Sequence, residues 1–114
     1  MSSKFVQNRR AQGRYDLHLP LHYRLSLKGE PPKTGSATTC EISAMGLSFR
    51  SRKPLPVGAH IEILLEWPAK YRDVDPISLQ ITGFIVRCEG NRVAVRMTSH
   101  KFKITLAQLE SATA

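Results

Sequence analysis

Residues 15–28 alternate between apolar and polar side chains without a break, and this pattern commits that part of the chain to a β-strand. The odd positions are Tyr15, Leu17, Leu19, Leu21, Tyr23, Leu25 and Leu27, and the even positions are Asp16, His18, Pro20, His22, Arg24, Ser26 and Lys28. Successive side chains of a strand point to opposite faces, so one face is predicted to be buried and the other to face solvent. Pro20 lacks a backbone N–H and predicts a strand edge or a break in the hydrogen-bond ladder.

Several shorter strand patterns follow, each bounded by turn residues. We expect strands over residues 37–43, 46–51, 60–67, 77–89 and 92–99, and turns or loops over residues 29–36, 54–58, 68–76 and 89–91. Gly83 predicts a bulge or bend within its strand. Residues 103–112 are the one segment with helical spacing and good helix formers. This arrangement predicts an all-β fold, a small antiparallel barrel with a C-terminal α-helix.

The length and net charge of the chain limit how many domains it can form and which kinds of partner it favours. Its 114 residues suffice for one core, which we divide into a flexible tail over residues 1–8 and a barrel domain with its helix over residues 9–114. The formal charge of +8 favours partners that carry phosphate, such as nucleic acid, nucleotide or anionic lipid, although scattered solubilising charge gives the same total. No signal peptide or membrane-spanning run is evident, so we expect a cytoplasmic protein, not inserted in a membrane, with reduced Cys40 and Cys88.

One short motif precedes the first predicted strand, and a second lies further along the chain. Arg10 to Arg14 has the pattern R-x-x-x-R and precedes that strand, and Glu41 to Gly46 has the pattern E-x-S-x-x-G between two of the short strands. The R-x-x-x-R pattern alone arises often by chance in a basic chain. Both motifs together, in this order and within a barrel-like strand pattern, resemble the PilZ domain family, and the resemblance extends over residues 9–110.

The resemblance implies a six-stranded antiparallel barrel that binds the bacterial second messenger cyclic dimeric GMP (cyclic di-GMP), with no cofactor besides this ligand. Arg10 and Arg14 match the family's arginine pair, which grips the phosphates and guanine edges of the ligand. A guanidinium group is planar, always charged and forked, so it suits both targets. Ser43 matches the family serine, which donates or accepts at a phosphate or base edge. Gly46 matches the family glycine, whose missing side chain permits an unusual turn and a close approach of the ligand.

Two further positions bear on how the ligand would bind. Glu41 stands where the family has Asp or Asn; its carboxylate still accepts from guanine or arginine, but it lies one methylene further out and predicts weaker binding. Arg9 occupies a position linked in the family to binding one messenger molecule or an intercalated pair. An arginine suits the pair, which carries four phosphate charges, whereas the alternative is an exposed charge without contacts. The arginine segment is expected to fold over the ligand and so change the surface presented to a downstream protein partner.

Three functions from different classes therefore stay open. The first is a single-domain receptor and effector for cyclic di-GMP, with Arg9, Arg10, Arg14, Glu41, Ser43 and Gly46 as the site. The second is a divergent PilZ-like protein-interaction module that has lost the nucleotide, an alternative that Glu41 keeps open. The third and least favoured is an oligonucleotide-binding barrel, motivated by the net charge.

Catalysis and metal binding are not expected. The serines have no evident histidine–acid partners, and the chain has no P-loop. His18 and His22 share a strand face but lie about 13 Å apart, too far for one metal ion. The large aromatic side chains are expected in the core rather than as platforms for base stacking, namely Tyr15, Phe49, Trp67 and Phe84.

Overall fold

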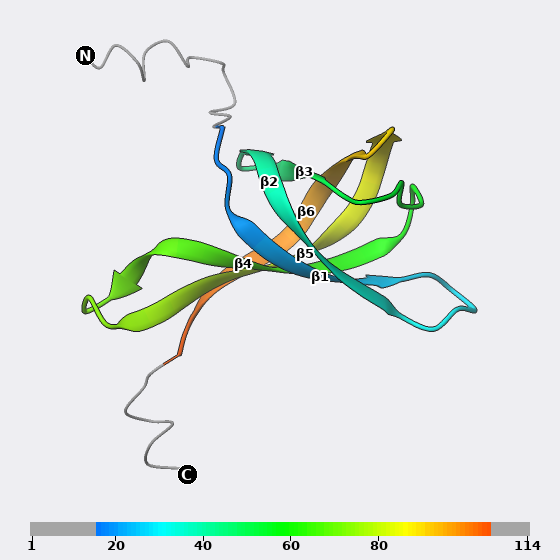
Figure 1. Ribbon diagram of the computed structural model, residues 1–114. Coiled ribbons are helices and arrows are strands. Elements are labelled where there is room, and N and C mark those ends of the chain that lie inside the picture. Colours follow the sequence, from blue (N-terminus) through cyan, green and yellow to red (C-terminus); the bar gives the residue numbers. More distant parts are fainter. Residues whose placement is uncertain (1–15, 106–114) are drawn as a thin grey trace.

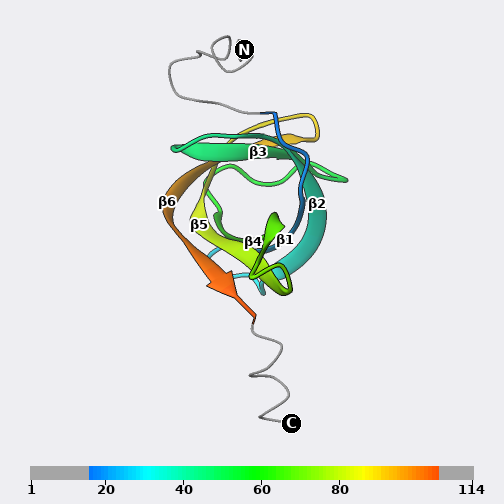
Figure 2. The ribbon, with the colours of Figure 1, turned by 90° about the vertical axis from the view of Figure 1, so that its left-hand side faces the viewer.

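The computed structural model describes residues 16–105, which form six antiparallel strands in one closed barrel (Figure 1). The strands are β1 (Pro20–Ser26), β2 (Lys33–Ile42), β3 (Gly46–Arg50), β4 (His60–Tyr71), β5 (Asp75–Glu89) and β6 (Arg92–Ile104). Their order around the barrel is β1-β2-β3-β6-β5-β4, and Figure 2 shows the ring that they form. The predicted six-stranded antiparallel barrel is confirmed.

The core fills the inside of this ring with side chains from alternate strand positions. The largest fully buried side chains are Phe49, Leu21, Ile61, Ile63, Leu65, Ile81, Ile85, Val93 and Thr39. The ring of Tyr23 stacks on Phe49, with ring centroids 5.6 Å apart. Since Val93 and Val95 point inward, the residues on either side of them on β6 point outward, and the same alternation governs β3. The outer face of these two strands carries the candidate site.

The prediction that Phe84 lies in the core is wrong, because the side chain is 43% exposed. Ile81, Gly83 and Ile85 occupy the inward positions of this part of β5, so Phe84 faces outward, where it meets His60 edge-on with ring centroids 5.4 Å apart. Phe49 is fully buried, as predicted, and Trp67 is partly buried against the core. A register shift lies beside Gly83, where a bulge or bend was predicted, but its extra residue is Thr98 on β6, because Thr82 pairs with Ser99 and Gly83 pairs with Met97.

Strands β2, β4 and β5 begin earlier or end later than the sequence predicts. β2 begins at Lys33, inside the expected loop over residues 29–36. The loop expected over residues 68–76 shrinks to residues 72–74, because β4 and β5 continue as a paired hairpin to Tyr71 and Asp75. Arg72 and Asp73 turn this hairpin with φ angles of 56° and 63°. Left-handed residues at a tight turn match the twist of paired strands, so the hairpin can extend this far.

The end of β6 corrects the start of the predicted C-terminal helix. Lys103 and Ile104 pair with Ser78 and Ile77 of β5, so they continue the strand rather than begin a helix. Cross-strand pairing along the projecting β4–β5 hairpin therefore overrides the local helical spacing at this point. Residues 16–105 contain no helix, and the rest of the segment predicted as helical, from residue 106, lies outside the described residues, as does the tail over residues 1–8.

Candidate functional site

The start of the described chain is fastened beside β2. The buried hydroxyl of Thr39 donates a hydrogen bond to the carbonyl oxygen of Leu17, and the backbone N–H of Leu19 donates to this hydroxyl at 2.8 Å. Because Pro20 pairs with Thr38 in an antiparallel register, the residues before Pro20 run toward the Glu41 end of β2. Figure 1 shows the first described residues, in blue, beside the end of β2 that leads to β3. Arg9, Arg10 and Arg14 themselves lie outside the described residues.

The E-x-S-x-x-G motif forms the turn between β2 and β3. The backbone N–H of Ser43 donates to the carbonyl oxygen of Gly46 at 2.8 Å, and the Ser43 hydroxyl donates to the same oxygen at 3.3 Å. The hydroxyl also accepts from the backbone N–H of Met45 at 3.3 Å. Serine favours turns for this reason, since its side chain replaces a backbone partner. The turn holds the Ser43 side chain at the end of β2, beside Glu41.

Gly46 is needed because another strand comes very close. A Cβ atom at this position would lie 2.0 Å from the carbonyl oxygen of Val95 on β6. Positive φ angles among the described glycines occur at Gly29, Gly58 and Gly90, so Gly46 does not adopt the left-handed conformation that favours glycine in a turn. The glycine of the motif therefore permits close packing of β3 on β6.

An open groove of about 490 Å³ lies on the outer face of the barrel, across the end of β2 and over β3, β6 and β5. Its lining residues include Glu41, Ser43 and Gly46, so the structure brings together the three predicted site residues that it describes. Cross-strand pairing places Glu41 opposite Ser48, and Ser48 opposite Ala94. The small side chains of Ser48 and Ala94 leave open space above the bed of the groove. The volume is in the range typical of small-molecule sites.

Three arginines that the sequence analysis did not select also line this groove, namely Arg87, Arg92 and Arg96. The alternation R-V-A-V-R over residues 92–96 was the signal available for two of them, because it puts Arg92, Ala94 and Arg96 on one strand face. Arg92 Nη2 lies 3.7 Å from Glu41 Oε1 and donates to Ser48 Oγ at 3.3 Å. With Glu41 and Glu89, the lining side chains carry three positive and two negative charges.

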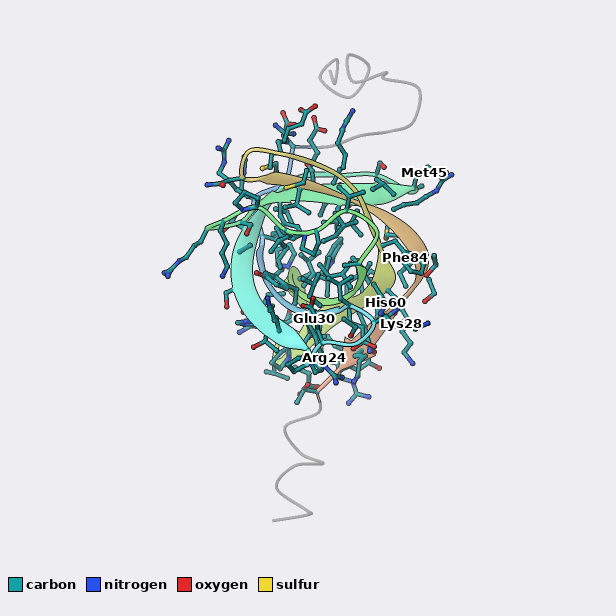
Figure 3. All side chains as sticks on the ribbon, turned by 90° about the vertical axis from the view of Figure 1, so that its right-hand side faces the viewer. Arg24, Lys28, Glu30, Met45, His60 and Phe84 are labelled. Carbon is teal, nitrogen blue, oxygen red and sulfur yellow. The ribbon has the colours of Figure 1, made fainter. Side chains whose placement is uncertain are left out.

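Apolar side chains also line the groove. Met45 at the β2–β3 turn is 56% exposed and Val86 on β5 is 50% exposed, and both line the groove. Figure 3 shows Met45 projecting from the turn, with Phe84 further along the same side of the barrel. The groove therefore offers guanidinium groups and apolar side chains to a single ligand, a combination that suits an anion with flat rings.

A second hollow of about 450 Å³ lies over β1, β2 and β4, and differs in its chemistry. Of its lining residues, Arg24 faces Glu62, with Nη1 3.9 Å from Oε1. His22 Nε2 lies 3.8 Å from Oε2 of Glu66, which does not itself line the hollow, and Lys103 lines it as well. His22 Nδ1 is also 3.0 Å from Ser36 Oγ. Glu41, Ser43 and Gly46 do not line this hollow.

The described residues also bear on the expectations about cysteines, metal binding and membrane insertion. Cys40 and Cys88 are free thiols. Within residues 16–105, no group of three histidine, cysteine or acidic side chains is arranged to hold a metal ion. The same range contains no helix that is long and apolar enough to cross a membrane.

Comparison with known protein families gives a match over nearly the whole chain. The model of the PilZ domain matches residues 8–110, a range that includes both motifs and all six strands. No curated protein matches the chain.

Proposed function

The chain belongs to the PilZ domain family, and on this premise we propose that it is a receptor for cyclic di-GMP. The observation that carries the proposal is the meeting of Glu41, Ser43 and Gly46 around one groove, beside the point where the N-terminal segment joins the barrel. The nucleotide would occupy the outer face of β3 and β6, with Arg9, Arg10 and Arg14 completing the site from the N-terminal side.

The groove residues offer complementary chemistry to a guanine dinucleotide. The Glu41 side chain is 25% exposed, so its carboxylate still faces the groove and can accept hydrogen bonds from guanine N1 and N2. The Ser43 hydroxyl can donate to a phosphate oxygen if it releases the carbonyl oxygen of Gly46, a bond that is already long at 3.3 Å. The packing of Gly46 against β6 keeps the bed of the groove free of a side chain.

Chain geometry allows the arginine segment to reach this groove. The carbonyl oxygen of Leu17 accepts a hydrogen bond from Thr39, which lies two residues before Glu41 on β2. A residue three positions before Leu17, such as Arg14, is at most about 11 Å from it along an extended chain, and Arg10 is at most about 25 Å from it. Both distances suffice for arginine side chains to contact a ligand in the groove.

The net positive charge of the groove lining is smaller than the negative charge of the ligand, and the N-terminal arginines would supply the difference. The groove lining has a net charge of only one, from three arginines and two glutamates. Cyclic di-GMP carries two phosphate charges, and an intercalated pair carries four. Arg10 and Arg14 would supply the missing positive charge through forked hydrogen bonds, and Arg9 would add another when two ligand molecules bind. Closure of this segment over the ligand would change the surface beside the groove, which a downstream protein partner could then recognise.

Calorimetric titration of the full chain with cyclic di-GMP tests the proposal. We expect saturable binding with a dissociation constant in the micromolar range or below, and a stoichiometry of two ligands if Arg9 serves an intercalated pair. The Arg9→Ala variant should then bind one. Cyclic di-AMP is the matched control, because it has the same two phosphates but lacks guanine O6 and N2, and it should bind far more weakly.

A silent titration at tens of micromolar ligand would refute nucleotide binding. The alternative would then be a PilZ-like protein-interaction module without its ligand. Binding of both dinucleotides with equal affinity would point instead to general attraction between phosphate and a basic surface. A steep loss of that binding with added salt would identify this second case.

A further inference from the structure

Strand β6 carries a second R-x-x-x-R element, formed by Arg92 and Arg96. Residues four apart on a strand share a face and lie about 13 Å apart. Ala94 stands between the two arginines, and pairing with β3 puts Ser48 opposite Ala94 and Gly46 opposite Arg96. The two arginines therefore extend from one face of β6, on either side of Ala94.

Arg92 already contacts Glu41 at the β2 side of the groove and Ser48 in its bed. Its Nη2 atom lies 3.7 Å from Glu41 Oε1 and donates to Ser48 Oγ at 3.3 Å. Glutamate has one more rotatable bond than the aspartate or asparagine typical of this motif in the PilZ family, so ordering its side chain on ligand binding costs more entropy. A contact that orders Glu41 before the ligand arrives reduces that cost.

Arg96 is differently placed. Its side chain lines the groove and is exposed, and within residues 16–105 it takes part in none of the ion pairs, which involve Arg24, Arg92 and His22. Arg96 pairs with Phe84 of β5 on one side and with Gly46 of β3 on the other. Gly46 has no side chain that could occupy the space beside the Arg96 side chain. A guanidinium group in such a position can meet an incoming phosphate without first breaking a contact with a carboxylate of the described chain.

We propose that Arg92 and Arg96 form the fixed cationic wall of the cyclic di-GMP site, in which Arg96 binds a phosphate and Arg92 positions Glu41. The inference rests on the proposed function and deepens it. In the proposed function the N-terminal R-x-x-x-R element would add its charge to this wall, whereas the element on β6 is held by the barrel. Arg92 is a positioning residue, because it acts through Glu41, whereas Arg96 touches the ligand.

Titration of the full chain with cyclic di-GMP separates these roles from general charge effects. The variants are Arg92→Gln and Arg96→Gln, and the matched control is Arg24→Gln, which removes one exposed guanidinium group from β1, outside the groove. We expect each groove variant to raise the dissociation constant by about 10-fold or more, as for loss of a hydrogen bond to a charged group. The control should stay within about twofold of the wild type. Thermal unfolding checks that all three fold, as expected for exposed strand positions.

A second set of titrations, in a Glu41→Gln background, tests the positioning role of Arg92. If Arg92 acts through Glu41, Arg92→Gln should change the dissociation constant by less than about threefold in this background, while Arg96→Gln should keep its full effect. An undiminished effect of Arg92→Gln would overturn the positioning role. If the wild type binds and both arginine variants bind like Arg24→Gln, the inference fails and the proposed function stands. If the wild type does not bind, both fail.

Discussion

Replacing Arg10 and Arg14 together by alanine is expected to weaken the binding of cyclic di-GMP by at least about 100-fold. Each arginine is proposed to make a charge-assisted hydrogen bond to the ligand, and loss of one such bond costs roughly 1.5–3 kcal/mol. Two losses at one ligand would leave Arg9 and the groove residues, and the charges of the groove lining nearly cancel. Calorimetric titration of the double variant beside the wild type measures the effect.

The control for this experiment is Arg24→Ala/Lys28→Ala, which removes the same amount of charge from a different side of the barrel. Figure 3 shows Arg24 and Lys28 well away from Met45 at the β2–β3 turn, and neither residue lines the groove. This control should bind with nearly the affinity of the wild type at physiological salt, because charges further away than the Debye length are screened. Equal weakening by both double variants would mean that net charge, rather than the motif, attracts the ligand.

Replacing Gly46 by alanine is expected to damage the fold and the site together. The added methyl group would lie 2.0 Å from the carbonyl oxygen of Val95, which belongs to the backbone and cannot rotate away. β3 and β6 would have to separate where they form the bed of the groove. Overpacking of this kind costs about 1–3 kcal/mol, so urea denaturation should show a free energy of unfolding lower by about that amount. Ligand binding should weaken too, because Ser48 and Ala94 would shift apart.

Gly58→Ala provides the comparison for this variant. A methyl group there would meet nothing within 4 Å, and its cost arises only from a φ angle of 95°. It should lower stability through backbone strain but leave the affinity for cyclic di-GMP unchanged. A Gly46→Ala protein with the stability and affinity of the wild type would contradict the close packing of β3 on β6 as the reason for this glycine.

The fold could be predicted from the sequence where local patterns and long-range packing agree. The alternation over residues 15–28 and the turn residues between the later strands were enough for a closed antiparallel barrel. The prediction for Phe84 failed because it assigned an aromatic residue to the core against the alternation of its own strand, in which Ile81, Gly83 and Ile85 point inward. The helix start at Lys103 was wrong because pairing with distant strands decides whether a strand continues beyond its neighbours. Helical spacing at the end of the chain says nothing about such pairing.

The candidate site was predictable only in part, for the same physical reason. Glu41, Ser43 and Gly46 are adjacent in sequence and were recognisable as one motif. Arg92 and Arg96 approach that motif through the register of β3 against β6, which places residue 94 opposite residue 48. No local pattern specifies this register, although the alternation over residues 92–96 does show that the two arginines share a face.

The departure at Glu41 has a structural counterpart on β6. In the sequence, the longer acid predicted weaker binding, because its side chain has more freedom to lose. In the structure, Arg92 contacts this carboxylate and the hydroxyl of Ser48. The pair is partly exposed, so the contact stabilises the fold little. Its proposed value lies in ordering the site, which is why the double-variant titrations in the Glu41→Gln background are informative.

Nuclear magnetic resonance of the 15N-labelled full chain, with and without cyclic di-GMP, tests the central claim most directly. The claim is that the N-terminal arginines and the outer groove hold cyclic di-GMP between them. We predict that backbone amide signals shift for residues 9–14, for residues 41–48 and for residues 92–96, while His22 and Leu64 in the second hollow keep theirs. Saturating ligand that left the signals of residues 41–48 and 92–96 in place, or shifted only those around the second hollow, would contradict it.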